Sequence, residues 1–84
     1  MKEENYAVLG TTVNVAFVDE IIGEKIDFFI DENDSKGKRI FRKKRVVNPR
    51  ELDAKTKIIL PYGESGIKIK ERFENNYKGI YILI

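Results

Sequence analysis

The sequence contains no cysteine and no histidine, and only two prolines. Disulfides, thiol nucleophiles, ordinary zinc sites and mechanisms that depend on imidazole are therefore excluded. No run approaches the roughly 18 apolar residues that a membrane helix needs, and the first ten residues lack the apolar core of a signal peptide. We expect a cytoplasmic protein that holds no metal and no cofactor.

Leucine and alanine, the strong helix formers, are also scarce. Isoleucine occurs 12 times and valine 6 times, against 4 leucines and 3 alanines. Side chains branched at Cβ suit a pleated sheet and restrict a helix. A chain of 84 residues is long enough for one small domain. The sequence therefore predicts a single all-β domain over residues 1–84, a small barrel or strongly twisted antiparallel sheet of the oligonucleotide-binding or SH3-like kind.

Apolar segments separated by turn residues indicate where the strands lie. The predicted strands cover residues 11–18, 24–30, 39–47, 56–60 with 67–73, and 79–84. Residues 31–37 read as a turn and lack the glycine and the final acid of a calcium-binding loop. Asn48 is suited to cap a helical turn with Pro49 at its first position, and residues 49–55 offer at most one such turn.

One predicted strand has a particularly regular alternation. Ile67 and Ile69 alternate with Lys68, Lys70 and Arg72. In a strand, successive side chains point to opposite faces, so the isoleucines would face the core and the three cations would face water. This pattern predicts a half-buried strand with a basic outer face.

Charge is strongly sorted along the chain, although the net charge is only +2. Residues 1–34 carry nine acids and two bases, residues 36–50 carry eight bases and no acid, and residues 51–84 carry six bases and five acids. The bases of the middle block are Lys36, Lys38, Arg39, Arg42, Lys43, Lys44, Arg45 and Arg50. Eight bases in this block outnumber the nearby acids that can pair with them.

An antiparallel hairpin of residues 24–30 with 39–47 would place Phe29 beside Arg42 and Lys44, with Asp27 opposite Lys44. Cations pair with phosphate while a ring stacks on a base, so this face predicts nucleic-acid binding by a basic β-ribbon. The predicted phosphate contacts are Arg39, Arg42, Lys43, Lys44 and Arg45, with Lys68, Lys70 and Arg72 as a second basic track and Phe29 as a stacking ring.

The same charges allow two other interpretations. An acidic strand beside a basic one can form cross-strand ion pairs, such as Asp27 with Lys44, each worth a few tenths to about 1 kcal/mol. Alternatively, the acidic and basic surfaces belong to a protein-interaction module, such as a regulator or inhibitor of a host enzyme. Asp19, Glu20 and Glu24 could supply an acid and a base, but nothing in the sequence holds them in a cleft. We therefore expect no enzymatic activity.

Three stretches of the second half carry a resemblance to a known family: residues 50–60, Pro61 with residues 67–70, and Arg72-Phe73 with Tyr77. They resemble small proteins of integrative conjugative elements in Gram-positive bacteria, a family of unknown function described as helicase processivity factors. The chain departs from that pattern because it lacks the family's central-strand tyrosine and the acidic pair after the last strand. The resemblance implies a β-rich accessory protein of a mobile genetic element that acts on single-stranded or duplex DNA beside a helicase.

Overall fold

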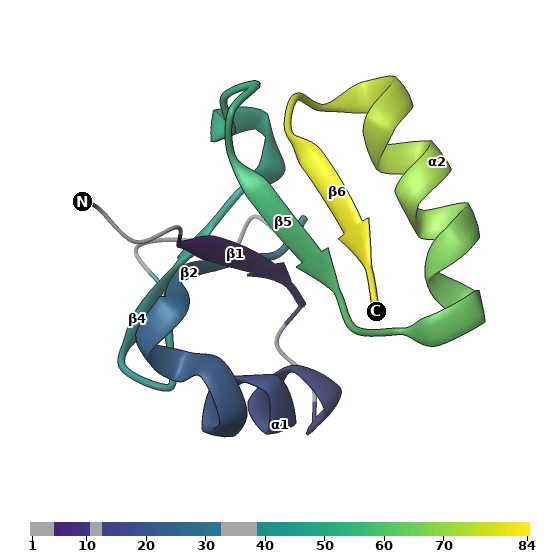
Figure 1. Cartoon of the computed structure of the whole chain (residues 1–84). Coiled ribbons are helices and arrows are strands. Elements are labelled where there is room, and N and C mark those ends of the chain that lie inside the picture. Colours follow the sequence, from purple (N-terminus) through teal and green to yellow (C-terminus); the bar gives the residue numbers. More distant parts are fainter. Residues whose placement is uncertain (1–4, 11–12, 33–38) are drawn as a thin grey trace.

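The computed structural model describes residues 5–10, 13–32 and 39–84, and these residues form one mixed sheet with helices on both faces (Figure 1). The strands are β1 (Tyr6–Leu9), β2 (Ile26–Ile30), β3 (Arg39–Phe41), β4 (Lys44–Val47), β5 (Lys57–Leu60) and β6 (Ile80–Leu83). The helices are α1 (Val13–Ile22) and α2 (Gly66–Asn76), with single 3₁₀ turns η1 (Gly23–Lys25), η2 (Pro49–Glu51) and η3 (Gly63–Ser65). The prediction of an all-β barrel is therefore wrong.

The strand order explains why the helices lie on opposite faces. The strands lie in the order β3-β4-β2-β1-β5-β6, and every neighbouring pair is parallel except β3 with β4. From β1 the chain crosses through α1 to β2 on one side, and from β5 it crosses through α2 to β6 on the other. Right-handed crossovers in opposite directions put their helices on opposite faces. The result is a doubly wound α/β sheet with one antiparallel edge strand.

Two apolar clusters fill the space between the sheet and its covering elements. Successive residues of β1 separate into different clusters, as expected for a strand that is buried on both faces. The cluster on the α2 side contains Ala7, Leu9, Ile30, Leu52, Ile58, Leu60, Phe73 and Tyr81. The cluster on the α1 side contains Val8, Val15, Val18, Ile26, Phe29 and Ile59.

Residues 11–18 were predicted as a strand, but residues 13–22 form helix α1. Val15 and Val18 are buried and Ile22 is half-buried, and these three positions fall on one side of a helix. Packing of this side against the sheet outweighs the weak β preference of valine and isoleucine.

Residues 67–73 were also predicted as a strand, and this prediction is wrong because they form most of helix α2. Parallel strands such as β5 and β6 need a crossover connection, which is usually a helix. Ile69, Phe73 and Tyr77, spaced four residues apart, pack toward the core on the α2 side. The apparent alternation with lysine therefore arises from a helix, and the basic residues do not form a strand face.

The predicted strand at residues 39–47, within the basic block, is two strands instead of one. Arg42 and Lys43 have positive φ angles of 49° and 68°, which make a tight two-residue turn between β3 and β4. The predicted antiparallel pairing of this block with residues 24–30 is also wrong. β2 runs parallel to β4, with Phe29 opposite Val46.

Other local predictions are confirmed. Strands lie within the predicted segments 24–30, 56–60 and 79–84, as β2, β5 and β6. Asn48 caps the turn η2 by accepting a hydrogen bond of 3.0 Å from the backbone N–H of Arg50, with Pro49 at the first position. Most of the turn predicted at residues 31–37 lies outside the described residues.

Candidate ligand site at the carboxyl ends of the strands

A cavity of about 260 Å³ lies at the carboxyl ends of β1 and β2, where residues of α2 form part of its lining. Its lining residues come from both strand ends, from the segment after β5 and from α2: Leu9, Gly10, Ile30, Asp31, Glu32, Tyr62, Ile69, Arg72 and Phe73. In open α/β sheets, ligands bind outside the carboxyl ends of the strands, near the point where the winding direction changes. Here that point lies between β1 and β5.

The inner wall of the cavity is apolar. Ile30 and Phe73 are almost completely buried, and Leu9 is 6% exposed. These side chains belong to the cluster on the α2 side and are held by close packing. The cavity therefore offers an apolar surface that is already formed, which is typical of small-molecule sites.

Tyr62 and Gly10 fix the position of the strand ends around the cavity. The Tyr62 hydroxyl donates a hydrogen bond of 2.7 Å to the carbonyl oxygen of Leu9, and the Gly10 N–H donates one of 2.7 Å to the carbonyl oxygen of Ile30. Gly10 has a φ of 108°, and a Cβ at this position would collide with the Tyr62 hydroxyl. Glycine is thus required here both by backbone conformation and by space.

The polar rim is centred on Glu32, which follows β2. Glu32 Oε2 accepts hydrogen bonds from Arg72 Nη1 at 2.6 Å and from the Tyr77 hydroxyl at 3.0 Å, so the rim joins the end of β2 to α2. The hydrogen bond from Arg72 is the main cause that lowers the pKa of Glu32 below its ordinary value. The same carboxylate raises the pKa of Tyr77. The Glu32 side chain is 37% exposed and remains accessible to a ligand.

Two of the predicted phosphate contacts of the basic block, Arg42 and Lys44, are paired within the protein. Asp19 on α1 accepts a hydrogen bond of 2.8 Å from Arg42 Nε on one carboxylate oxygen and one of 2.8 Å from Lys44 Nζ on the other. Arg42 also lies 3.6 Å from Glu20. The basic residues do form ion pairs, but their acid lies on helix α1 and not on a neighbouring strand. The partner of Lys44 is Asp19, so the predicted cross-strand pairing with Asp27 is wrong.

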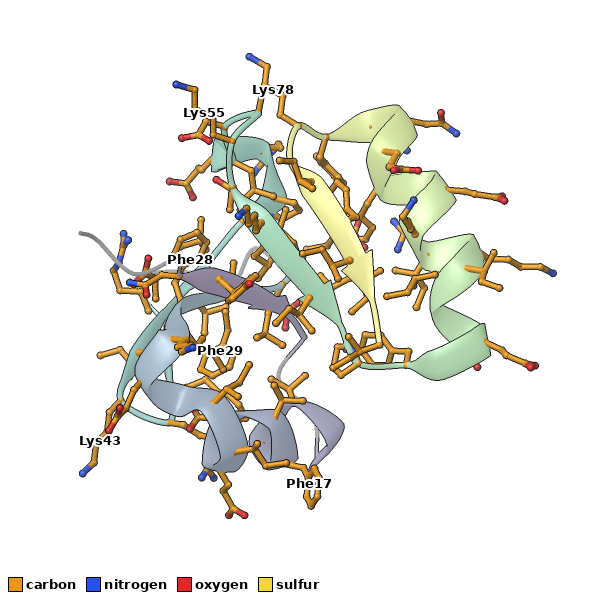
Figure 2. All side chains as sticks on the ribbon, in the orientation of Figure 1. Phe17, Phe28, Phe29, Lys43, Lys55 and Lys78 are labelled. Atoms are coloured by element: carbon orange, nitrogen blue, oxygen red, sulfur yellow. The ribbon has the colours of Figure 1, made fainter. Side chains whose placement is uncertain are left out.

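The remaining members of the block are arranged differently. Lys43 stands at the tip of the turn and points away from the molecule (Figure 2). Arg45 is exposed, with its guanidinium carbon 5.7 Å from the centre of the Phe28 ring. Only the backbone of Arg39 is described, as the first residue of β3.

The predicted second basic track does not form a row of cations on a strand face. Lys68, Lys70 and Arg72 lie on helix α2, where alternate residues point in nearly opposite directions. Lys70 pairs with Glu74 at 2.9 Å, and Arg72 belongs to the rim of the cavity.

Phe29 was predicted as an exposed stacking ring, and this prediction is wrong. The Phe29 side chain lies between the sheet and α1 (Figure 2) and is completely buried. Its ring meets the Phe41 ring edge-on, with the centroids 5.0 Å apart. Strand β2 is covered on both faces, so alternation along it does not produce a wet side.

Sequence reasoning missed the cavity because Glu32 and Arg72 are 40 residues apart. One signal was present in the sequence. An acidic pair, Asp31-Glu32, directly follows the apolar strand of residues 26–30 and comes 21 residues after Gly10, which itself follows an apolar stretch. Without the parallel strand order, that spacing has no meaning.

Comparisons of the chain with protein-family models, with curated proteins and with solved structures give no match. The resemblance to conjugative-element proteins therefore stays a prediction. Within residues 5–10, 13–32 and 39–84, no helix is long and apolar enough to cross a membrane. In the same residues, no three acidic side chains are grouped so that they could hold a metal ion.

Proposed function

We propose that this protein binds a small hydroxyl-bearing ligand of the nucleoside type in the cavity at the carboxyl ends of β1 and β2. The observation that carries the proposal is the position of Asp31 and Glu32 in the cavity wall, directly after β2 and 21 residues after Gly10. In doubly wound nucleotide-binding sheets, an acid about 20 residues beyond the first glycine, after the second strand, accepts a hydrogen bond from a ribose hydroxyl.

The parallel strands have the matching order. When the antiparallel edge strand β3 is set aside, the order is β4-β2-β1-β5-β6, which is the 3-2-1-4-5 order of the doubly wound nucleotide-binding fold. Strand order alone does not assign a function, so the proposal depends on the residues of the cavity. Its apolar inner wall suits the face of a base, and its acidic rim suits hydroxyl groups.

The glycine pattern argues against a dinucleotide. In the dinucleotide fingerprint, glycines stand at the first, third and sixth positions of the turn after the first strand, and the third position lets the backbone approach the pyrophosphate. Here the first position is Gly10, but the third is Thr12 and the sixth is Val15, which is completely buried. We therefore expect a nucleoside or mononucleotide, whose size also fits the modest volume of the cavity.

A ligand hydroxyl would bind at Glu32 beside the existing contacts. A carboxylate has about four acceptor positions on its two oxygens. The hydrogen bonds from Arg72 and Tyr77 both fall on Oε2. In this proposal Arg72 and Tyr77 orient the carboxylate and keep it ionised, while the ligand donates to it.

The test is a titration of the ¹⁵N-labelled protein with adenosine, guanosine, cytidine and uridine, followed by amide chemical shifts. We expect one of them to shift the amides of Gly10, Ile30 and Asp31, which line the cavity. The 2′-deoxy form should bind about tenfold or more weakly, because a hydrogen bond to a charged acceptor is lost.

Glu32→Gln should weaken binding to a similar degree, whereas the matched control Glu71→Gln removes an exposed acid of α2 outside the cavity and should bind normally. The proposal is contradicted if all four nucleosides leave these amides unchanged up to about 10 mM, a concentration at which even very weak ligands bind. It is equally contradicted if Glu32→Gln binds as well as the unaltered protein.

Nucleic-acid binding remains a second candidate because of one observation. The exposed Arg45 guanidinium lies beside the half-buried Phe28 ring, and Phe28 lines a second cavity with Lys55 and Lys57 at the amino ends of the strands. Cations beside a ring suit a phosphate and its base. This cluster replaces the predicted surface around Phe29, and a role beside a helicase on a mobile element stays a prediction.

Fluorescence anisotropy with labelled single-stranded and duplex DNA, over about 50 to 200 mM salt, tests this candidate because phosphate contacts give steep salt dependence. Arg45→Glu should reduce the affinity severalfold, whereas Lys25→Glu, the same charge change at another exposed position, should have less effect. Equal losses would mean that net charge alone attracts the DNA.

A further inference from the structure

One half of the α1 side of the sheet carries exposed isoleucines. In the pairing of β5 with β6, Tyr81 lies opposite Ile58, whose side chain belongs to the α2 side. Ile80 and Ile82 alternate with Tyr81 and therefore face the α1 side. Ile80 is 47% exposed and the following Ile84 is 60% exposed. Helix α1 crosses beneath β1 and β2 and does not extend under β6 (Figure 1).

Helix α1 is apolar on a second side as well. Val15 and Val18 face its own sheet, but Phe17 and Ile21 are 63% and 66% exposed. Figure 2 shows Phe17 pointing away from the sheet. A helix that is apolar on more than one side is normally buried on more than one side. The exposed pair therefore indicates a second apolar surface against which α1 packs.

The direction of that pair follows from the ion pairs of Asp19. Asp19 points toward the β3–β4 hairpin, where it bonds Arg42 and Lys44. Phe17 and Ile21 are each two residues from Asp19, about 200° around the helix, and so point away from the hairpin and toward the β5–β6 half. One apolar step in the surface is thus formed by α1 and β6, and we call it the step. Its wall consists of Phe17 and Ile21, and its floor consists of Ile80, Ile82 and Ile84.

We infer that a second copy of this chain fills this step, about a twofold axis that runs parallel to the strands. Rotation about such an axis places the α1 helix of each copy over the β6 face of the other. Phe17 of each copy then contacts Ile82 of its partner, and the two Ile21 side chains approach each other. Because the protruding helix and the bare floor belong to the same face of one chain, the surface is self-complementary, as a twofold interface requires.

The charges at the ends of the step agree with this orientation. A twofold axis parallel to the strands keeps the amino ends of both sheets on the same side. It therefore brings Lys57, which lies beside Ile80 at the amino end of β5, near Glu24, which follows α1 in the partner. Both side chains have at least some exposure, and the charges are opposite. An axis perpendicular to the strands would instead superimpose the two α1 helices.

The interface is small and has few side chains, so we expect a dimer with a dissociation constant on the order of 10–100 μM. Sedimentation equilibrium of the whole chain from about 5 to 500 μM covers that range. Phe17→Lys should shift the chain to a monomer, because it places a charge in the centre of the step. Ile40→Lys is the matched control: Ile40 is 73% exposed on β3, far from the step, and the dimer should persist.

The absence of cysteine allows a direct geometric test. Phe17→Cys and Ile82→Cys chains are prepared separately, mixed and oxidised, and a cross-linked dimer should form between the two kinds of chain. The mixture of Ile40→Cys with Ile82→Cys should give much less cross-linking.

Each alternative outcome overturns the inference. If the chain is monomeric at every concentration, a second copy does not bind in the step. Strong binding of a hydrophobic dye by that monomer would assign the step to a different partner. A dimer that survives Phe17→Lys and forms no Phe17→Cys cross-link associates through another surface.

Discussion

The two halves of the α1 side of the sheet have the same kind of strands but different surroundings. Over β1, β2 and β4, the helix buries Phe29 and ties its acidic side to the basic hairpin through Asp19. Over β6, Ile80 and Ile84 remain exposed. A helix is about 10 Å wide and neighbouring strands are about 4.8 Å apart, so one helix covers only two or three strands of a six-stranded sheet. Among the described residues, α1 is the one α-helix on this face, and the half over β6 is left uncovered by it.

The largest effect on stability that tests this comparison is expected from two phenylalanines on the same side of the sheet. Phe29→Ala should lower the free energy of unfolding by about 3–5 kcal/mol, because it opens a cavity at a completely buried position. Phe17→Ala, at the surface of α1, should change it by no more than about 0.5 kcal/mol in the monomer. Urea unfolding at low protein concentration measures both.

Raising the protein concentration sharpens this test. If the step is a dimer interface, the unaltered chain gains stability with concentration by mass action, and Phe17→Ala loses that gain. The comparison is wrong if Phe17→Ala is as destabilising as Phe29→Ala in dilute solution.

The next effect concerns the ion pairs that hold α1 over the covered half. Asp19→Ala should lower the free energy of unfolding by about 1–2 kcal/mol, since it removes the acceptor that the half-buried Lys44 and the more exposed Arg42 share. Thermal unfolding at neutral pH measures this loss. Glu24→Ala is the control because it also removes an acid near the end of α1, at an exposed position, and should have little effect.

The pH dependence of Asp19 gives an independent measurement. Burial raises its pKa, but the hydrogen bonds from Lys44 and Arg42 lower it more, so the pKa in the folded chain is below the ordinary value of 3.8. The stabilisation is therefore fully present above the unfolded pKa and is lost as pH falls below about 4. Asp19→Asn should lose less stability than the unaltered chain over that range. Parallel acid unfolding of the two chains would show that the pairs contribute nothing.

The same comparison explains which parts of the fold could be predicted from sequence. The strands at residues 26–30, 57–60 and 80–83 are apolar runs between turn residues, and local pattern was sufficient to find them. Helix α1 was missed because Val15, Val18 and Phe17 prefer strands, and only the sheet beneath them decides in favour of a helix. In α2, isoleucine alternates with lysine over residues 67–70, and this pattern is typical of a half-buried strand.

The candidate site was less predictable than the fold. Leu9, Ile30 and Tyr62 come together only because β2 and β5 lie next to β1, an order that no local pattern reveals. The basic block was visible in the sequence, but Asp19 neutralises two of its members from a helix that was predicted as a strand. Contacts between segments far apart in the sequence therefore determine both where the site lies and which basic side chains are paired.

The smallest expected effect lies in the hairpin turn that Asp19 holds against α1. Lys43 has a φ of 68°, a conformation that costs residues other than glycine roughly 1 kcal/mol. Lys43→Gly should therefore raise the free energy of unfolding by about 0.5–1 kcal/mol, while Lys43→Ala removes the same charge and keeps the strain, so it should have almost no effect. Urea unfolding of the three chains separates strain from charge. If alanine and glycine stabilise equally, charge repulsion within the basic block is the larger cost, and the ion pairs to α1 neutralise it only in part.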